Sequence, residues 1–85
     1  SPAVEIINKV SKKINKSILI NDPYVKKNIF EYNKKINMVE LKNGISKSSD
    51  IIVLVGHNKY KNIKRLINKR QSIFDICNIV KKNSN

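Results

Sequence analysis

Hydrophobic residues along the chain occur in short clusters that alternate with polar, lysine-rich stretches. The most apolar cluster is residues 51–55, which are all Ile, Val or Leu and are followed by Gly56. A run this short and this rich in β-branched residues is typical of a strand that is buried on both faces. Such strands belong to parallel sheets flanked by helices, which bind ligands at the carboxyl ends of their strands. We therefore expect a binding site near Gly56 and His57.

The remaining clusters predict a regular alternation of helices and strands. Short apolar runs predict further strands at residues 17–21, 37–41 and 72–77. Apolar residues spaced three and four apart predict helices at residues 2–15, 24–32, 42–49 and 60–68. In the first helix, the predicted buried stripe is Ile6, Ile7, Val10 and Ile14. In the last helix, the residues predicted to face inward are Tyr60, Ile63, Leu66 and Ile67.

This alternation predicts an α/β fold, a three-layer Rossmann-like parallel sheet with flanking helices. The chain begins with a helix, however, and in doubly wound sheets of order 3-2-1-4-5 the strand before the first helix is the central one. If the chain follows this plan, its first and central strand is missing. The strands at Ile18 and Ile51 then lie on either side of the gap. We therefore expect the chain to be a piece of a longer protein.

The length of 85 residues allows one small domain, expected at residues 1–80, with a polar tail at 81–85. No apolar run approaches the ~18–20 residues of a membrane span, and no signal peptide is apparent. The single cysteine, Cys77, cannot form an internal disulfide, so a reducing cytoplasm is the expected location. No metal-ligand spacing occurs in the sequence.

The net charge of +12 makes a small basic nucleic-acid-binding module the alternative function. Sixteen Lys and only two Arg carry this charge, and no run of Lys exceeds two residues. Proteins that read bases use Arg for bidentate contacts, so the composition argues against this alternative. The joint excess of Lys, Asn and Ile indicates instead the coding bias of an AT-rich genome. A response-regulator-like domain ranks last, because Asp22 and Asp75 are too few to hold Mg²⁺.

Four motifs resemble those of a known family. Ser1-Pro2-Ala3 resembles the start of the first long helix in the carboxyl-terminal domain of nucleotide-sugar dehydrogenases. Residues 22–25, Asp-Pro-Tyr-Val, resemble the turn after that domain's second strand. Residues 49–61 resemble its Ala-Asp-hydrophobic strand that ends in a His, and residues 74–78 stand where the family has Asp-Thr-Arg-Asn. His57, in place of a Trp common in UDP-glucose dehydrogenases, is similar to the UDP-N-acetylmannosamine branch.

The resemblance implies the carboxyl-terminal, UDP-binding domain of the UDP-glucose/GDP-mannose dehydrogenase family. That family uses NAD to oxidise the C6 hydroxyl of a nucleotide sugar to a carboxylate. The implied substrate is UDP-N-acetylmannosamine, whose uronic acid serves surface polysaccharide synthesis. The implied partners are the UDP-sugar, the rest of the dehydrogenase chain and a second copy in a homodimer. The Gly-x-Gly-x-x-Gly of the NAD domain and the family's catalytic Cys are absent, so we expect this chain alone to bind no NAD and to catalyse nothing.

Six residues are candidates for contacts with the UDP-sugar, and all but Asn78 have a structural alternative: His57, Lys59, Asp22, Asp75, Cys77 and Asn78. His57 can cap the following helix, and Asp22 can form an Asx turn ahead of Pro23. Asp75 can accept bonds from the amides of a neighbouring loop. Lys59, like Lys61 and Lys64, can meet a diphosphate or lie on a solvated helix face. Cys77 replaces the family's substrate-binding Arg, whereas a cysteine at a strand end is usually a small buried hydrophobe.

The expected gap also predicts how the chain folds. Each strand beside it has an edge without backbone partners, and a buried unpaired amide or carbonyl costs about 1–3 kcal/mol. Small domains have only about 5–15 kcal/mol of stability. We therefore expect these residues alone to be molten, aggregated or self-paired, and about 20 preceding residues to restore cooperative unfolding.

Overall fold

The structure is a computed structural model that describes residues 2–25, 29–30 and 32–82. It divides into two compact units, Ser1–Glu40 and Leu41–Asn85, and each is described by itself. Ser1, the first residue of the Ser-Pro-Ala motif, and the tail residues 83–85 lie outside the described residues.

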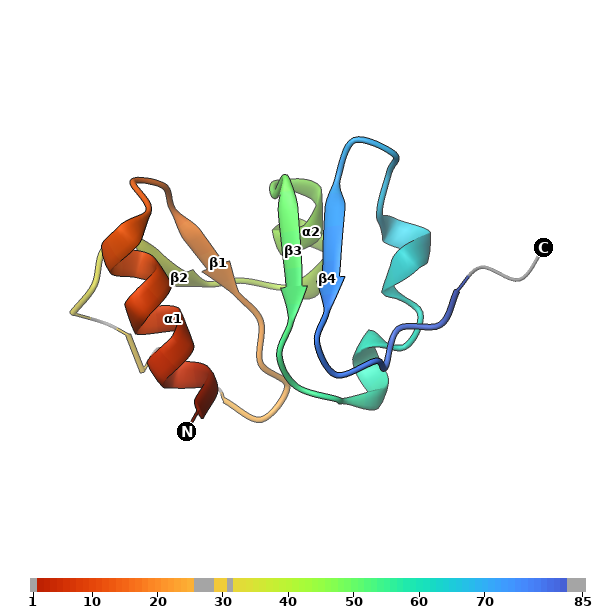
Figure 1. Ribbon diagram of the computed structural model, residues 1–85, viewed down its shortest axis with the longest axis horizontal. Helices are drawn as coiled ribbons and strands as arrows, with labels where there is room; N and C mark the ends of the chain where they lie inside the picture. Colours follow the sequence, from red (N-terminus) through yellow and green to blue (C-terminus); the bar gives the residue numbers. More distant parts are fainter. Residues whose placement is uncertain (1, 26–28, 31, 83–85) are drawn as a thin grey trace. The chain divides into compact units, whose positions relative to one another are not determined.

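The first unit contains helix α1 (Pro2–Lys13) and strands β1 (Ile18–Ile20) and β2 (Ile36–Met38) (Figure 1). Glu5 lies in the first turn of α1 and two lysines lie in its last turn, which complements the helix dipole. The two strands are parallel, with Ile18 opposite Ile36 and Ile20 opposite Met38. This is the strand pairing expected for the first two strands of the chain.

The most buried residue of α1 is a serine, not a member of the predicted apolar stripe. Ser11 is 2% exposed, whereas Ile6 is 44% exposed. The Ser11 hydroxyl accepts a hydrogen bond from Asn33 Nδ2 at 2.8 Å, so burying it leaves no unpaired polar group. Lys35 Nζ donates to the carbonyls of Ser11 and Ile14, which holds a positive charge at the carboxyl end of the helix. Ile14 follows α1 and is 37% exposed, so the predicted stripe is wrong at both of its ends.

The predicted helix at residues 24–32 is wrong wherever the structure describes that segment. Tyr24, Ile29, Phe30 and Tyr32 lie in turns. Asp22 Oδ1 accepts a hydrogen bond from Tyr24 N at 2.8 Å, so the chain after β1 forms an Asx turn instead of a helix start. Phe30 is nevertheless buried, as the apolar pattern predicts, at 6% exposure. Residues 26–28 and 31 lie outside the described residues.

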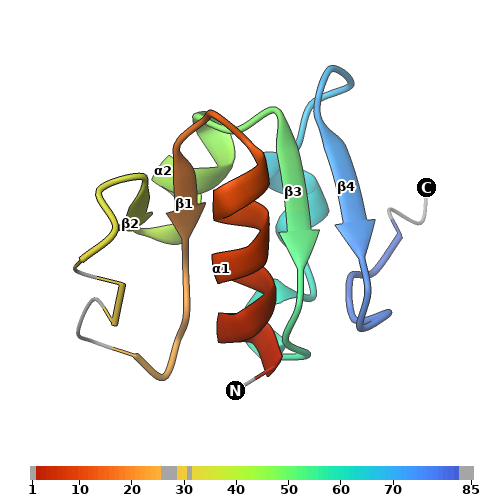
Figure 2. The same cartoon turned by 60° about the vertical axis from the view of Figure 1, so that its left-hand side comes forward.

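The second unit contains helix α2 (Leu41–Ser46), strands β3 (Asp50–Val53) and β4 (Ser72–Asp75), and the short 3₁₀ helices η1 (Asn58–Tyr60) and η2 (Ile63–Leu66). Figure 2 shows β3 and β4 running in the same direction. Their register places Ile51 opposite Ile73 and Ile52 opposite Phe74. Elements thus occur close to where the sequence predicts them, but the strands are shorter.

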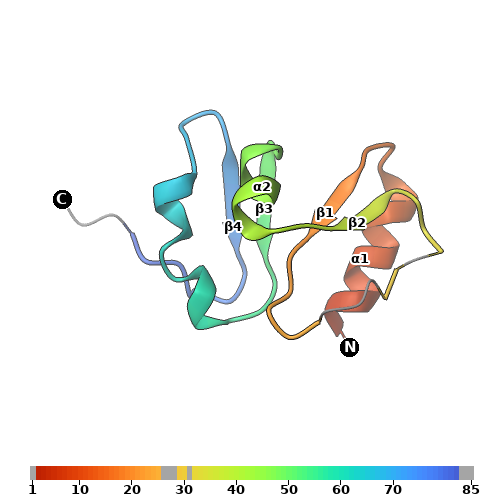
Figure 3. The same cartoon turned by 180° about the vertical axis from the view of Figure 1, so that it is seen from behind.

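The core of the second unit lies on one face of the β3–β4 pair. Its buried residues come from four elements: Ile45, Val53, Tyr60 and Ile63. Figure 3 shows α2 in front of these strands. The opposite face is open, with Ile52 at 53% and Phe74 at 55% exposure. The prediction of a strand buried on both faces is therefore wrong for β3, which alternates between inward and outward residues as a half-covered strand does.

Two 3₁₀ helices replace the predicted helix at residues 60–68. Asn62 interrupts the segment, with φ −112° and ψ 19°. Tyr60, the last residue of η1, and Ile63, the first residue of η2, are buried as predicted. Leu66 is 40% exposed, so its predicted inward position is wrong, whereas Ile67 packs against the core.

Gln71 joins two parts of the second unit that are distant in the sequence. Its Nε2 donates to the carbonyls of Ile45 at 2.6 Å and Ser48 at 2.7 Å, and its Oε1 accepts from Asn68 N at 2.9 Å. Ile45 lies in the last turn of α2 and Ser48 follows the helix, where backbone carbonyls have no partners further along a helix. One side chain therefore fixes the end of α2 against the start of β4.

The strand pairing agrees with the predicted fold class. β1 pairs with β2 and β3 pairs with β4, and among the described residues no further strand joins either sheet. If the central strand is removed from a doubly wound sheet of order 3-2-1-4-5, two parallel pairs of strands remain, 3-2 and 4-5, and the observed pairing matches them. The fold is thus a small α/β fold with two parallel two-stranded sheets and flanking helices.

Candidate functional site

Two loops of the second unit meet where β3 and β4 end. Residues 54–57 follow β3, and residues 76–80 follow β4. A Cβ atom placed on Gly56 would lie 3.8 Å from Cys77 Cβ, an ordinary van der Waals distance. Because the strands are parallel, both loops lie at the same edge of the sheet. This edge brings together five of the six predicted site residues: His57, Lys59, Asp75, Cys77 and Asn78.

His57 holds the start of η1. Its Nδ1 accepts a hydrogen bond from Lys59 N at 2.9 Å, which confirms the predicted capping alternative. Its ring also makes an edge-on contact with the Tyr60 ring, with centroids 6.1 Å apart. Because Nδ1 acts as the acceptor, the neutral imidazole carries its proton on Nε2. The ring is thus held in one orientation beside the loop.

Asp75 closes the loop after β4. Its Oδ2 accepts a hydrogen bond from Val80 N at 2.8 Å, which confirms the predicted bond to a neighbouring loop amide. Its Oδ1 is buried and has no hydrogen-bond partner among the described residues. Asp75 lies beside Val53 in the register, so the carboxylate faces the core side of the sheet instead of solvent.

Cys77 and Asn78 form the exposed tip of that loop. Cys77 is an exposed free thiol, so the expectation of a small buried hydrophobe is wrong: the cysteine lies in a turn past the end of β4 and not in the strand. Asn78 adopts φ 53°, a left-handed conformation that Asn tolerates better than most residues. Its N–H donates to Asp75 O at 3.3 Å. The tip therefore presents a thiol and an amide to solvent.

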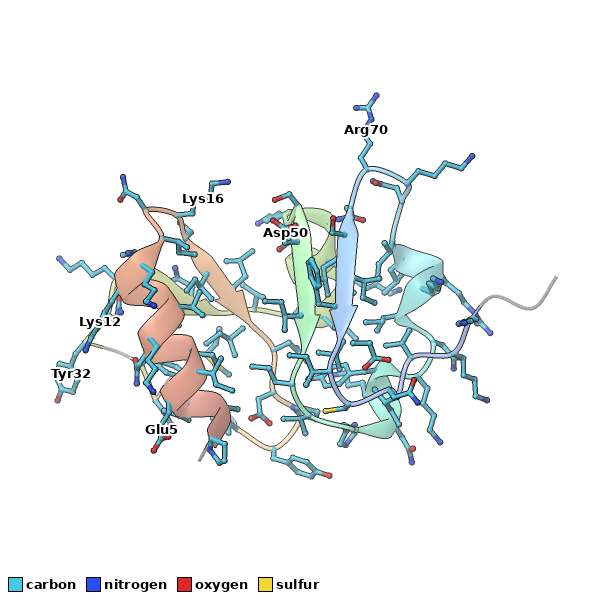
Figure 4. The ribbon with its side chains drawn as sticks, viewed as in Figure 1. Glu5, Lys12, Lys16, Tyr32, Asp50 and Arg70 are labelled. Carbon is cyan, nitrogen blue, oxygen red and sulfur yellow. The ribbon has the colours of Figure 1, made fainter. Side chains whose placement is uncertain are left out.

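The lysines near this edge differ in exposure. Lys59 is exposed in η1, whereas Lys61 and Lys64 are half-buried. Other basic residues are spread over both units; Lys12 and Lys16 project from the first and Arg70 from the loop before β4 (Figure 4). The second unit nevertheless carries ten Lys and Arg residues against two Asp, a net charge of +8 out of +12.

Asp22 is the one predicted site residue that the structure does not bring to this edge. It belongs to the first unit, where its side chain forms the Asx turn to Tyr24. This confirms the structural alternative for Asp22. The structure groups the remaining five residues without it.

Three residues with structural functions escape the sequence analysis. Ser11, Lys35 and Gln71 make the hydrogen bonds that hold α1 and α2, yet nothing in the apolar pattern points to them. A polar residue at a core-facing helical position, such as Ser11, is the one available signal.

The described residues do not fit NAD or a metal ion. The chain has two glycines, Gly44 and Gly56. A Cβ atom on Gly56 would meet its nearest neighbour at an ordinary van der Waals distance, so no close contact there requires glycine. A phosphate cradle of the three-glycine type therefore has no counterpart here. In the part of the chain that the structure describes, no three His, Cys, Asp or Glu residues are grouped as metal ligands. None of the described helices is long and apolar enough to cross a bilayer.

Comparison with known proteins places the chain in a family. Searches of curated proteins and of solved structures gave no significant match. A family model described as "UDP-glucose/GDP-mannose dehydrogenase family, UDP binding domain" matches residues 1–82, which is nearly the whole chain. The chain therefore belongs to the UDP-glucose/GDP-mannose dehydrogenase family, of which it carries the UDP-binding domain.

Proposed function

We propose that this chain is the nucleotide-sugar-binding part of an NAD-dependent UDP-sugar 6-dehydrogenase. The family match over residues 1–82 is the observation that carries the proposal. The chain binds and orients the nucleotide end of the donor. The remainder of the dehydrogenase supplies the NAD-binding domain and the catalytic cysteine, and the enzyme acts as a homodimer in the cytoplasm.

The proposed donor is UDP-N-acetylmannosamine, which the enzyme oxidises to its uronic acid for surface polysaccharide synthesis. His57 after β3 supports this choice within the family, because it stands where UDP-glucose dehydrogenases commonly have Trp. The proposed contacts lie at the carboxyl-terminal edge of β3 and β4. Lys59 faces the phosphates, and the exposed Asn78 amide and the His57 ring have the polar groups to contact ribose or sugar hydroxyls.

Cys77 distinguishes this site from the family pattern. A thiol replaces the Arg of Asp-Thr-Arg-Asn, so a bidentate cation is absent from the tip of the β4 loop. Neighbouring lysines then carry the positive charge for the phosphates. A Cys77→Arg variant is accordingly expected to bind the donor more tightly than the native chain.

Calorimetric titration tests the proposal on the longest natural protein that carries this chain. UDP and UDP-N-acetylmannosamine are expected to bind in a 1:1 ratio, UDP-glucose more weakly, and GDP not at all. Equal affinity for UDP and GDP would contradict the uridine assignment. Tighter binding of UDP-glucose than of UDP-N-acetylmannosamine would contradict the choice of sugar.

A basic nucleic-acid-binding module is the second candidate function, favoured by the net charge of +12. Electrophoretic shift with duplex and single-stranded oligonucleotides at two salt concentrations separates the candidates. Phosphate contacts weaken steeply as salt rises. Binding to an oligonucleotide that survives about 0.2 M salt, together with no binding of UDP, would favour this candidate.

A further inference from the structure

The two segments at the candidate site approach each other at a second point, beyond the approach of Gly56 to Cys77. The N–H of Lys81 donates to the carbonyl of Lys61 at 2.8 Å. Figure 1 shows the carboxyl-terminal segment running beside the 3₁₀ helices that follow β3. The segments after β3 and after β4 therefore approach each other at two positions, and the hydrogen bond at the second position joins two lysines.

This second contact concentrates positive charge. Four lysines come from the two segments and form what we call the lysine junction: Lys59, Lys61, Lys81 and Lys82. None of the four forms an ion pair with a described residue. Lys59, Lys81 and Lys82 are exposed and Lys61 is half-buried, so their charges are accessible to a ligand.

The acidic residues of the second unit do not neutralise the junction. Asp50 lies at the start of β3, at the opposite end of the strands. Asp75 is close in the chain, but its Oδ2 accepts the bond from Val80 N and its Oδ1 is buried. One of its two oxygens is thus engaged by the loop backbone, and a single carboxylate cannot balance four lysines. Like charges gathered without a counter-charge repel one another, and a bound anion relieves that repulsion.

We propose that the lysine junction binds the diphosphate of the nucleotide, with Lys61 and Lys81 as its two principal contacts. This assignment rests on the proposed function and locates the phosphates within the same edge of the sheet. Lys is a point charge with three donors and suits phosphate oxygens that approach from several directions. A diphosphate can accept from both segments at once, whereas a single phosphate has fewer oxygens to share between them. The ligand thereby holds the two segments together.

The test compares two double variants of the longest natural protein that carries this chain. Lys61→Gln with Lys81→Gln removes the two principal contacts and keeps the Lys81 N–H bond to Lys61 O. Lys47→Gln with Lys69→Gln removes the same charge from exposed positions before β3 and before β4, at the other end of the strands. Calorimetric titration with UDP, uridine and inorganic pyrophosphate, at constant ionic strength, gives each affinity. Thermal unfolding of each variant verifies that it is folded.

The junction variant is expected to bind UDP and pyrophosphate about tenfold more weakly than the native chain, because each accessible charge pair contributes a factor of a few. Its affinity for uridine should stay unchanged, and the control variant should bind all three ligands as the native chain does. The melting temperature of the junction variant should equal or exceed the native value, since two repelling charges are gone. Equal loss of UDP affinity in both double variants would show that net charge, and not the position of the lysines, determines the affinity, and would overturn the assignment.

Two further outcomes separate the assignment from the proposed function. If UDP binds the native chain but the junction variant binds it equally well, the lysine junction is wrong and the proposed function stands. If pyrophosphate binds at the junction but UDP does not bind at all, both the nucleotide assignment and the proposed function are overturned. Binding of pyrophosphate that an oligonucleotide displaces in about 0.2 M salt would overturn both in favour of a nucleic-acid site.

Discussion

The carboxylate of Asp75 and the backbone N–H of Val80 are joined by a 2.8 Å hydrogen bond that spans five residues. The bond folds the segment after β4 back toward the core, where Val80 and Ile79 pack against Val53 and its neighbours. Cys77 and Asn78 are displayed at the tip of the loop that this bond closes. The Asp75 carboxylate thus has a structural function: its bond to Val80 holds the loop that carries Cys77 and Asn78.

Replacing Asp75 should therefore loosen the loop without involving the ligand directly. We expect Asp75→Ala to lower the free energy of unfolding by about 1–3 kcal/mol, because the Val80 amide loses its acceptor. Asp75→Asn keeps an acceptor oxygen of the same size and should cost less. Urea unfolding of both variants, with the exposed Asp50→Ala as control, provides the measurement. Equal losses for Asn and Ala would show that the charge, which both variants lack, and not the bond to Val80, is what matters.

Lys35 should stabilise α1 through the end of the helix. Its Nζ donates to the carbonyls of Ser11 and Ile14, which lack partners further along the helix. We expect Lys35→Met to cost about 1–2 kcal/mol, from the lost charged hydrogen bonds and the lost charge at the negative end of the dipole. Hydrogen exchange of the α1 amides should accelerate accordingly. Lys34→Met is the matched control, because Lys34 is its exposed neighbour and should have almost no effect.

The sequence predicts the fold better than it predicts the burial of single residues. The predicted strands at residues 17–21, 37–41, 51–55 and 72–77 each contribute to a parallel strand, because short β-branched clusters between polar turns have few other stable arrangements. The second strand begins one residue early, at Ile36, and Leu41 begins α2 instead of ending that strand. The same pattern cannot reveal which faces of a strand are covered. To bury both faces of β3, helices must pack against each face. The three described helical segments α2, η1 and η2 all contribute buried residues to the core on the same face of the strand.

Local hydrogen bonds explain the helices that the apolar pattern predicts and the structure lacks. Asp22 bonds to Tyr24 N, and Asn68 Oδ1 accepts from Arg70 N at 2.9 Å, so short polar side chains form turns where apolar spacing favours helix. For the candidate site, the sequence places His57 after one strand and Cys77 and Asn78 at the end of another, and the parallel pairing of β3 and β4 puts both loops at the same edge. The inward direction of the Asp75 carboxylate and the contact between Lys61 and Lys81 depend on tertiary hydrogen bonds, which no spacing in the sequence encodes.

Two substitutions of His57 should separate its structural contribution from any contact with the ligand. His57→Asn keeps a side-chain acceptor for Lys59 N, since Asn is among the best N-cap residues, whereas His57→Ala removes it. We expect Ala to lower the free energy of unfolding by about 1 kcal/mol more than Asn does. Both variants should bind UDP more weakly than the native chain if the imidazole contacts the nucleotide. Native affinity in the Asn variant would restrict His57 to its capping function.

Successive residues of β3 direct their backbone N–H and C=O groups to opposite edges of the strand. This alternation predicts which amides of β3 exchange rapidly with solvent. Ser72 N donates to Ser49 O and Ile76 N donates to Val53 O, so the odd-numbered residues of this strand direct their backbone groups toward β4. In a parallel pair the intervening residues direct theirs to the other edge. Among the described strands, only β4 pairs with β3. The Ile52 amide should therefore have no partner in the sheet.

Hydrogen exchange measured residue by residue tests this expectation. Ile51 and Val53 amides should be protected, and the Ile52 amide should exchange much faster, although all three lie in one strand. A protected Ile52 would mean that another strand is bonded to this edge. If that protection grows with protein concentration, the added strand belongs to a second copy, as the low charge and high β-propensity of residues 51–55 favour. If the protection does not depend on protein concentration, the added strand is supplied by the same polypeptide.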